Sequence, residues 1–536
     1  MSSAAGVTVT VTGEELTAAR DAVLAEATTD GVAAALAGGD AGLWGPDARA
    51  EAEIRLGWLE LPASSRALLP QLHALRTELA AEHLDHVVLA GMGGSSLAPE
   101  VICATAGVEL TVLDTTDPGQ VRAALADRLD RTVVVVSSKS GGTIETDSHR
   151  RAYTQAFRDA GIADPGGRFV AVTDAGSPLE QTARDEGFRA VFLADPNVGG
   201  RYSALTAFGL VPSALAGVDV AALLDEAAAL SQVIGNADGN PALELGAVLG
   251  GAGTRGRDKV VLAEAGSGIP GFGDWAEQLI AESTGKDGTG LLPVVVGSAG
   301  SPGTAVQADT HLIRLGAGGD AGGEPHTSVE GPLGAQFLAW EYATAVAGRA
   351  LRINPFDQPN VTESKENTAR ILTAGRPEES PALVDGAVEV YADPALLGNA
   401  KGLADVLRAL VDAVPARGYL AVMAYLDRQT HAAAAGLRDV LAGRTDRPVT
   451  FGWGPRFLHS TGQYHKGGPQ VGAFLQITGA VAEDLPIAGR DYSFGTLQAA
   501  QAAGDREAIA GRGRPLVHLH LLDRSRGIRQ CLDAAR

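Results

Sequence analysis

Short apolar runs recur along most of the chain, and stretches with helical spacing separate them. Runs bounded by turn residues are typical of strands that are buried on both faces. Alternation of such strands with helices predicts a parallel sheet covered by helices. In the first half of the chain the runs are 86–90, 110–113, 133–136, 169–172 and 191–193, with candidate helices at 118–129 and 148–159.

The same rhythm restarts after a helical stretch at 218–233, whereas the first 80 residues read as mostly helical. We therefore predict an α/β protein with two doubly wound parallel-sheet domains, a helical N-terminal segment and a C-terminal α/β extension. The later runs are 260–263, 294–296, 419–424, 449–453, 474–477 and 516–520, with helices at 275–283 and 332–351. The predicted ranges are 1–80 for the N-terminal segment, 81–235 and 236–380 for the two domains, and 381–536 for the extension.

Composition narrows the possible functions. The net charge of −21 disfavours nucleic acid as a partner, because an acidic surface repels phosphates. The sequence contains no run of 18 or more apolar residues, so we expect no membrane span. The N-terminus does not resemble a signal peptide. Cys103 and Cys531 are too few for a disulfide framework or a zinc site, so we expect a cytoplasmic protein without a metal.

Lysine is rare in this chain. Only six of the 43 basic residues are lysines. A lysine that remains in such a composition can mark a place where arginine cannot substitute, because the two differ in size, hydration and acid–base chemistry. Four of the six lie within the motifs described below: Lys139, Lys286, Lys365 and Lys466.

Two small-residue loops each follow a predicted strand and precede a helix. The first, 91–96 (GMGGSS), has three interpretations: a turn that binds an anion, a dinucleotide-binding turn with Asp114 as the ribose ligand, or a tight turn without a ligand. The second, 138–143 (SKSGGT), offers three hydroxyls, a lysine and backbone N–H groups to a phosphate. A simple helix cap is its alternative. Two such loops on one sheet favour a sugar phosphate over a dinucleotide.

Four further segments carry candidate chemistry. Arg201 follows two glycines that could aim it into a cleft, where it could stabilise an oxyanion. Gln278 and Glu282 are four residues apart and share one face of a helix, which makes Glu282 a candidate general base. The other two segments are 354–365 (NPFDQPNVTESK) and 459–468 (HSTGQYHKGG).

Together these segments resemble the glucose-6-phosphate isomerase family, whose members carry two SIS-type, flavodoxin-like sugar-phosphate domains. The resemblance covers about 275 residues in the family's order, and segment 457–468 is closest to the isomerase half of transaldolase–isomerase fusion proteins. The matching segments are 91–99, 116–118, 138–146, 199–203, 278–286 and 354–365.

The resemblance implies interconversion of glucose 6-phosphate and fructose 6-phosphate through a cis-enediol, without a cofactor, in a homodimer with shared active sites. Most members carry the ring-opening histidine between the Glu282 and 354–365 motifs, near a Gly-Gln pair, but here segment 301–316 has only His311, in a poor match. The resemblance therefore assigns that role to His459, with His465 as the second choice. The implied catalytic residues are Glu282, Lys365, His459 and Arg201, and the implied substrate-binding residues are Gly94, Ser95, Ser138, Lys139, Ser140, Thr143, Gly200, Gln278, Gln358 and His465.

Three rival functions stay open at this point. Activity on mannose 6-phosphate depends on the shape of the pocket. A non-catalytic SIS-domain sugar-phosphate sensor would have phosphate loops without the catalytic glutamate and lysine. A nicotinamide-dependent dehydrogenase would use the first loop and Asp114.

Overall fold

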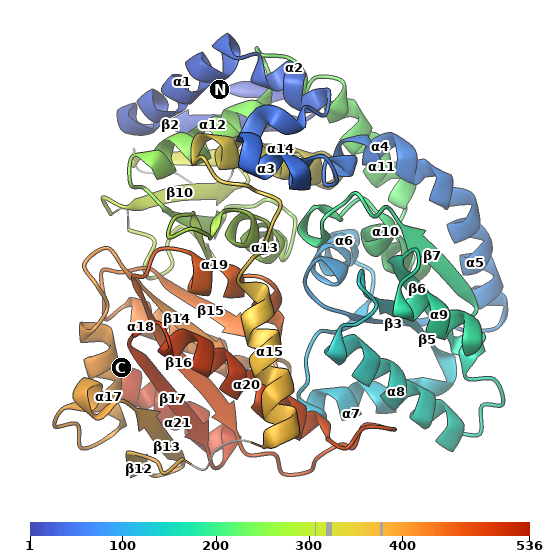
Figure 1. Cartoon of the computed structure of the whole chain (residues 1–536), viewed down its shortest axis with the longest axis vertical. Helices are drawn as coiled ribbons and strands as arrows, with labels where there is room; N and C mark the ends of the chain where they lie inside the picture. Colours follow the sequence, from blue (N-terminus) through green and yellow to red (C-terminus); the bar gives the residue numbers. More distant parts are fainter. Residues whose placement is uncertain (306, 318–323, 376–378) are drawn as a thin grey trace.

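Three sheets organise the protein. The computed structural model describes residues 1–305, 307–317, 324–375 and 379–536. Figure 1 shows the first-sheet region (teal) beside the third-sheet region (orange to red), with the second sheet and most of the N-terminal helices above them, while the last N-terminal helix lies along the outer side of the first-sheet region. These N-terminal helices are α1 (Glu14–Thr29), α2 (Val32–Ala37), α3 (Pro46–Ala52), α4 (Leu61–Ser64) and α5 (Leu69–Ala81).

The first sheet has five parallel strands in the order β4-β3-β5-β6-β7. This order is flavodoxin-like, and its switch point, where ligands bind in such folds, lies between β3 and β5. Both of these strands are buried along their whole length, which explains their unbroken apolar sequences. The strands are β3 (His86–Gly91), β4 (Thr111–Leu113), β5 (Thr132–Ser137), β6 (Phe169–Asp174) and β7 (Ala190–Ala194), with helices α6 (Leu97–Ala106), α7 (Pro118–Ala126), α8 (Ile144–Asp159), α9 (Pro178–Asp185) and α10 (Ala207–Ala216).

The second sheet combines four parallel strands with an antiparallel hairpin, in the order β1-β2-β11-β10-β8-β9. Its strands are β1 (Ser2–Ala4), β2 (Val7–Thr12), β8 (Lys259–Glu264), β9 (Leu292–Val296), β10 (Thr310–Leu315) and β11 (His326–Glu330). The helices of this region are α11 (Val220–Ser231), α12 (Pro241–Thr254), α13 (Phe272–Thr284) and α14 (Leu333–Ala350).

The N-terminal segment, predicted to be mostly helical, begins with this β-hairpin. Strand β2 reads VTVTVT, with Val7 and Val9 buried and the threonines half-buried. Such alternation is the signal of a half-buried strand. Ala5 and Gly6 both have positive φ, as a tight two-residue hairpin turn requires. Because β2 pairs with β11, the second sheet draws strands from both ends of the segment 2–330.

The third sheet lies in the predicted C-terminal extension and has the order β12-β13-β17-β16-β14-β15. Strands β14 to β17 are parallel, and β12 and β13 form an antiparallel hairpin at one edge. The strands are β12 (Leu383–Asp385), β13 (Val388–Ala392), β14 (Tyr419–Ala424), β15 (Val449–Trp453), β16 (Gly472–Gly479) and β17 (Leu516–Leu521). The helices are α16 (Pro394–Leu397), α17 (Leu403–Asp412), α18 (Gly436–Ala442), α19 (Gly462–Gly467), α20 (Phe494–Ala510) and α21 (Arg524–Ala535).

Shared apolar cores hold the three regions together. One core joins the first and second sheets with the N-terminal helices. Another joins the second sheet to the third, where Val261 and Val294 share a cluster with Tyr419 and Phe474. Helix α15 (Val361–Ala374) packs on α20 through Ile371, and Figure 1 shows it (yellow) between the first- and third-sheet regions. The predicted α/β class with parallel sheets is confirmed, while the predicted domain ranges stay predictions.

Candidate active site

The first glycine-rich loop brings distant segments of the chain into close contact. Gly93 has φ +56°, and a Cβ there would lie 2.7 Å from Nε2 of Gln278 and 2.9 Å from the carbonyl oxygen of His459. A Cβ on Gly94 would lie 1.9 Å from the carbonyl oxygen of Gly200. The two glycines therefore let this turn pack against three candidate segments. Ser95 is half-buried in the same turn.

The second loop leads into α8 and carries the predicted phosphate-binding hydroxyls. The hydroxyls of Ser138 and Thr143 are 2.9 Å apart, and Ser140 accepts a hydrogen bond from the Gly142 N–H at 3.3 Å. Lys139, by contrast, donates to Asp174 at 2.6 Å and to the carbonyl oxygen of Pro196 at 3.3 Å. Its ammonium group therefore holds the loop to the end of β6, and Lys139 does not line the pocket described next.

A pocket of about 210 Å³ lies against this loop. Its wall includes Ser140 and Thr143 from the loop, Lys365 from α15 and His459 from the segment after β15. These four residues were predicted from three motifs that are far apart in the sequence, and the fold brings them to one cavity. Glu145 and Gln501, which the sequence reasoning did not single out, also line the pocket.

Glu145 links His459 to the rest of the site. Its Oε1 lies 3.0 Å from Nε2 of His459 and accepts a hydrogen bond from Nε2 of Gln501 at 2.7 Å. Burial alone would raise the pKa of Glu145, but the charge and hydrogen bond of His459 and the charge of Lys365 outweigh burial and lower it. Glu145 is thus ionised near neutral pH, and an ionised carboxylate only accepts hydrogen bonds. Nε2 of His459 must therefore be the donor, which leaves Nδ1 for proton transfer.

The sequence feature that points to Glu145 is its place just after the hydroxyl-rich loop 138–143. It stands in the first turn of α8, two residues after Thr143, and its side chain is buried, with an exposure of 3%. Acidic residues at helix N-termini are common on protein surfaces, where they need no partner. A sequence alone does not show which of them is buried.

Glu282, on α13, is not among the residues that line this pocket, but Gln278 connects it to the segment of His459. Gln278 donates from one Nε2 atom to Oε2 of Glu282 at 3.1 Å and to the carbonyl oxygen of His459 at 2.8 Å. The spacing of four residues on one helical face thus works as predicted, because both side chains point the same way. Gln278 fixes the separation between the candidate general base and the backbone of the candidate ring-opening histidine.

Arg201 is the buried cation of the site. Its side chain is 1% exposed, and Nη1 lies 3.6 Å from Oε1 of Glu282. Nε donates to Ser283 at 2.8 Å, Nη1 donates to Oε1 of Gln358, and Nη2 donates to the carbonyl oxygen of Pro355 at 2.7 Å. The guanidinium therefore ties the helix that carries Glu282 to the segment that follows α14, which places Gln358 at this end of the site.

Lys286 supports the same junction. Its Nζ donates to Oδ1 of Asp357 and to the carbonyl oxygens of Asn354 and Asp357, at 2.6 to 2.7 Å. Burial, with the nearby charge of Arg201, lowers the pKa of Lys286 to about 8. An ammonium group that binds three oxygens at one point explains why this lysine stands in a chain that otherwise uses arginine.

His465 does not reach the pocket, in contrast to its prediction as a substrate-binding residue. Its ring is 2% exposed and packs against Tyr419, Phe457 and Phe474. Neither ring nitrogen has a hydrogen-bond partner among the described residues. Burial, together with the neighbouring cations Lys466 and Arg514, pushes the pKa of His465 well below its usual value, so the ring is neutral. The short helix α19 turns this side chain into the core while His459, six residues earlier, faces the pocket.

Asp114, the ribose ligand of the dinucleotide interpretation, is also engaged elsewhere. It is 2% exposed, and its Oδ2 lies 3.1 Å from Nε of Arg456, a residue of the third-sheet region. Ser96, which stands at the third glycine position of the dinucleotide pattern, lies 3.5 Å from the same carboxylate. A buried carboxylate that is paired with arginine does not offer itself to a ribose hydroxyl.

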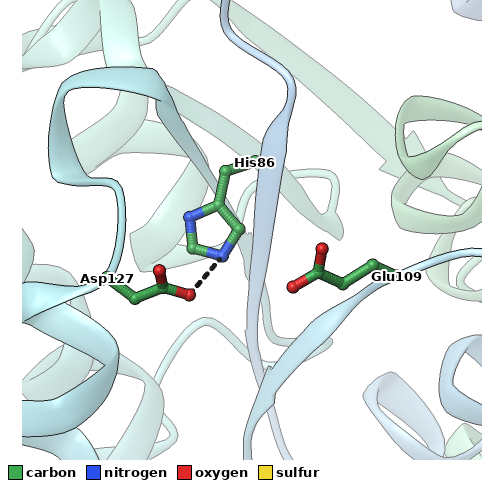
Figure 2. Close-up of side chains that lie close together, drawn as sticks. All are labelled: His86, Glu109 and Asp127. Carbon is green, nitrogen blue, oxygen red and sulfur yellow. Dashed lines mark ion pairs between the residues drawn. The ribbon is translucent and has the colours of Figure 1, made fainter.

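One cluster of potential metal ligands lies within the described residues. His86, Glu109 and Asp127 place their ligand atoms within 4.8 Å of one another at the amino end of β3, as Figure 2 shows. Arg128, however, forms ion pairs with both carboxylates, and both ring nitrogens of His86 lie within 3.0 Å of threonine hydroxyls. A guanidinium among the ligands disfavours a cation. The cluster is an ion-paired contact at the amino end of β3, whereas the pocket lies against the loop that follows the carboxyl end of β5.

Among the residues that the structure describes, no helix combines the length and the apolar sequence that crossing a lipid bilayer requires.

Similarity to known proteins is concentrated in the first half of the chain. The family model of phosphoglucose isomerase matches residues 76–245. A glucose-6-phosphate isomerase of Acaryochloris marina is 37% identical over 234 residues, which are 41% of this chain and 44% of that protein. The chain thus matches less than half of the length of this curated relative.

Two solved structures share the fold. A hypothetical protein of Thermus thermophilus aligns over 68% of this chain and its own full length, with a TM-score of 0.56 and 22% identity. A glucose-6-phosphate isomerase of Chlamydia trachomatis aligns over 58% of this chain and 74% of its own, with a TM-score of 0.50 and 22% identity. The resemblance drawn from the motifs is confirmed over residues 76–245, which match the family model of phosphoglucose isomerase.

Proposed function

We propose that the protein is an isomerase that interconverts D-glucose 6-phosphate and D-fructose 6-phosphate through a cis-enediol intermediate. The observation that carries this proposal is the convergence of Ser140, Thr143, Lys365 and His459 on one pocket. Gln278 joins that pocket to Glu282 by hydrogen bonds. A phosphate-binding loop, two groups for ring opening and a carboxylate for proton transfer are the parts that an aldose–ketose isomerisation needs.

In this proposal the phosphate binds at the start of α8. Ser140 and Thr143 offer hydroxyls there, and the N-terminus of a 16-residue helix favours an anion. Lys139 contributes by anchoring the loop to Asp174. Holding the phosphate fixes a small, flexible sugar in place, which supplies much of the advantage of a bound reaction over a free one.

Proton transfers follow from the remaining groups. His459 and Lys365 open the sugar ring by moving protons to the ring oxygen and from the anomeric hydroxyl, and His459 acts through Nδ1 because Nε2 is bonded to Glu145. Glu282 moves the proton between C1 and C2. Arg201 lies 3.6 Å from Glu282 and stabilises negative charge on the enediol oxygens.

All of these residues come from a single chain. His459, which lies after the lysine motif in the sequence, enters the site from the third-sheet region. In place of the shared active sites that the resemblance implied, we therefore propose that one chain forms a complete active site. The homodimer, the cytoplasmic location, the kinship with transaldolase–isomerase fusions and activity on mannose 6-phosphate stay predictions.

A coupled assay tests the proposal. Purified protein in EDTA is given fructose 6-phosphate, glucose-6-phosphate dehydrogenase and NADP, and NADPH is followed at 340 nm. We expect rapid NADPH formation that depends on the protein. The absence of turnover by folded protein that still binds the sugar phosphate would favour a sensor. Mannose 6-phosphate in place of fructose 6-phosphate in the same assay measures specificity.

A further inference from the structure

Gln501 lines the proposed active site but belongs to α20 of the third-sheet region, outside every motif discussed above. Its side-chain amide is bonded at both ends. Nε2 donates to Oε1 of Glu145 at 2.7 Å, and Oε1 accepts from the hydroxyl of Thr116 at 2.7 Å. Gln501, Glu145 and Thr116 are all buried, with exposures of 3%, 3% and 0%. A glutamine held in this way has one orientation.

The Thr-Asp-Pro motif at 116–118 contacts the third-sheet region through the side chains of Thr116 and Asp117. Because the Thr116 hydroxyl donates to the oxygen of the Gln501 amide, the nitrogen of that amide must face Glu145. Asp117 accepts a hydrogen bond from Arg524 of α21 at 2.6 Å and caps α7 through the N–H groups of Gly119 and Gln120. The motif therefore joins the first-sheet region to the third and orients a third-region side chain toward the pocket.

Glu145 receives both donors on a single oxygen. The Oε1 atom that accepts from Gln501 also binds Nε2 of His459. Two donors on one oxygen restrict rotation of the carboxylate, and hydrogen bonds to an ionised group are stronger than neutral ones. The titratable and charged groups that face Glu145 from the elements packed around it are His459, Lys365, His149, Tyr425 and Tyr492.

We propose that Gln501 is a positioning residue for the ring-opening step. With Thr116 behind it, Gln501 holds the Glu145 carboxylate against Nε2 of His459 and so keeps Nδ1 as the nitrogen that exchanges protons with the sugar. This inference rests on the proposed isomerase function. It assigns to the third-sheet region a second contribution to the site besides His459.

The test compares Gln501→Leu with Gln498→Leu. Gln498 is also a buried glutamine of α20, three residues earlier, and it faces Asp117 instead of Glu145. We expect Gln501→Leu to lower kcat by roughly 10- to 100-fold, the size of one charged hydrogen bond, while KM changes little. Gln498→Leu should keep kcat near that of the wild type.

The pH profile separates positioning from loss of packing. An ionised Glu145 can only accept a hydrogen bond from Nε2, whereas the protonated acid could also donate one, so Glu145 fixes the tautomer of His459 only while it is ionised. Removal of a donor raises the pKa of a carboxyl group. In a plot of kcat against pH, the fall of kcat on the acidic side should therefore occur at higher pH in Gln501→Leu than in the wild type. In Gln498→Leu it should occur at the same pH as in the wild type. Equal kcat values in the two variants, with the acidic-side fall at the same pH in both, would overturn the proposal.

A readout without turnover keeps this inference distinct from the proposed function. The ring nitrogens of His459, assigned by their loss in His459→Gln, report its tautomer in ¹⁵N-detected spectra. We expect a proton on Nε2 in the wild type and a changed tautomer balance in Gln501→Leu. If the wild type does not isomerise its substrate but the spectra change, the proposed function fails and the positioning stands. Unchanged spectra in Gln501→Leu contradict the positioning.

Discussion

The second and third sheets have the same layout but serve the site in different ways. In each, an antiparallel hairpin precedes four parallel strands and pairs with the last of them: β1–β2 with β11, and β12–β13 with β17. In each, the first parallel strand lies between the second and the third, since β8 is flanked by β9 and β10 and β14 by β15 and β16. The two regions are thus topological repeats.

Their catalytic contributions come from different connections. In the second sheet the helix between the first two parallel strands, α13, carries Gln278 and Glu282. The matching helix of the third sheet, α18, instead buries Arg438, which donates to the carbonyl oxygen of Val449. The third sheet supplies His459 from its next connection and Gln501 from the one after. The shared topology brings the connections of both sheets to the same place. The catalytic side chains, however, stand on different connections in the two sheets, so the topology alone does not predict them.

Removal of the second-sheet carboxylate should have the largest effect. Glu282→Gln keeps the shape and the hydrogen bond to Gln278 but removes the base, so we expect kcat to fall by roughly 10²–10⁴-fold or more. The control is Glu277→Gln on the same helix. Burial and the nearby charge of Asp274 raise the pKa of Glu277 to about 8, so this side chain is protonated at neutral pH and resembles glutamine already. Near-normal kcat in Glu282→Gln would remove it from the role.

The two histidines of the third-sheet region should separate cleanly. His459→Gln should lower kcat by roughly 10²-fold or more, because it removes an acid–base group that lines the pocket. His465→Leu should change kcat little, because a neutral ring whose nitrogens have no partner among the described residues is replaced by an apolar side chain. Kinetics and thermal unfolding of both variants check this. A large loss of kcat in a stable His465→Leu protein would return the ring-opening role to His465.

The contact between the first and third regions should affect stability more than chemistry. Arg524→Gln removes the cation that pairs with Asp117, a side chain with 0% exposure. Because a buried carboxylate then loses its partner, we expect a loss of up to about 3 kcal/mol in the free energy of unfolding, measured by denaturant titration. Arg526→Gln, an exposed neighbour on α21, should change stability by less than about 0.5 kcal/mol. Equal stabilities of the two variants would mean that this ion pair does not hold the regions together.

The sequence predicts best the strands that are short apolar runs, including the edge strands β9 and β15, whereas the buried strand β10, which reads THLIRL, is not predicted. The unbroken apolar runs that became β3, β5, β14 and β16 were placed within two residues of their ends, because strands covered on both faces are apolar throughout. The hairpin at 2–12 was missed although VTVTVT alternates clearly, and β12 and β13 were missed as well. Both hairpins lie at sheet edges, where only one face is buried and the apolar signal is weaker.

The candidate site shows the same division. Ser140, Thr143, Lys365 and His459 could be found because each stands in a motif of unusual composition. Gln501 stands in an Ala- and Gln-rich helix without such a motif, and only tertiary packing brings it to Glu145. His465 shares the motif of His459 but points into the core. A motif predicts that a segment is close to a site, whereas the direction of each side chain depends on the local helix.

The central claim is that a single chain supplies every catalytic group. It is tested most directly by co-expressing Glu282→Gln and His459→Gln with different affinity tags, purifying any mixed oligomer through both tags and measuring its isomerase activity. If each chain forms its own site, every site in the mixed oligomer lacks one group, and activity should stay at the level of the separate variants. Recovery of a substantial fraction of wild-type activity would show that His459 acts in the site of a partner subunit and would contradict the account.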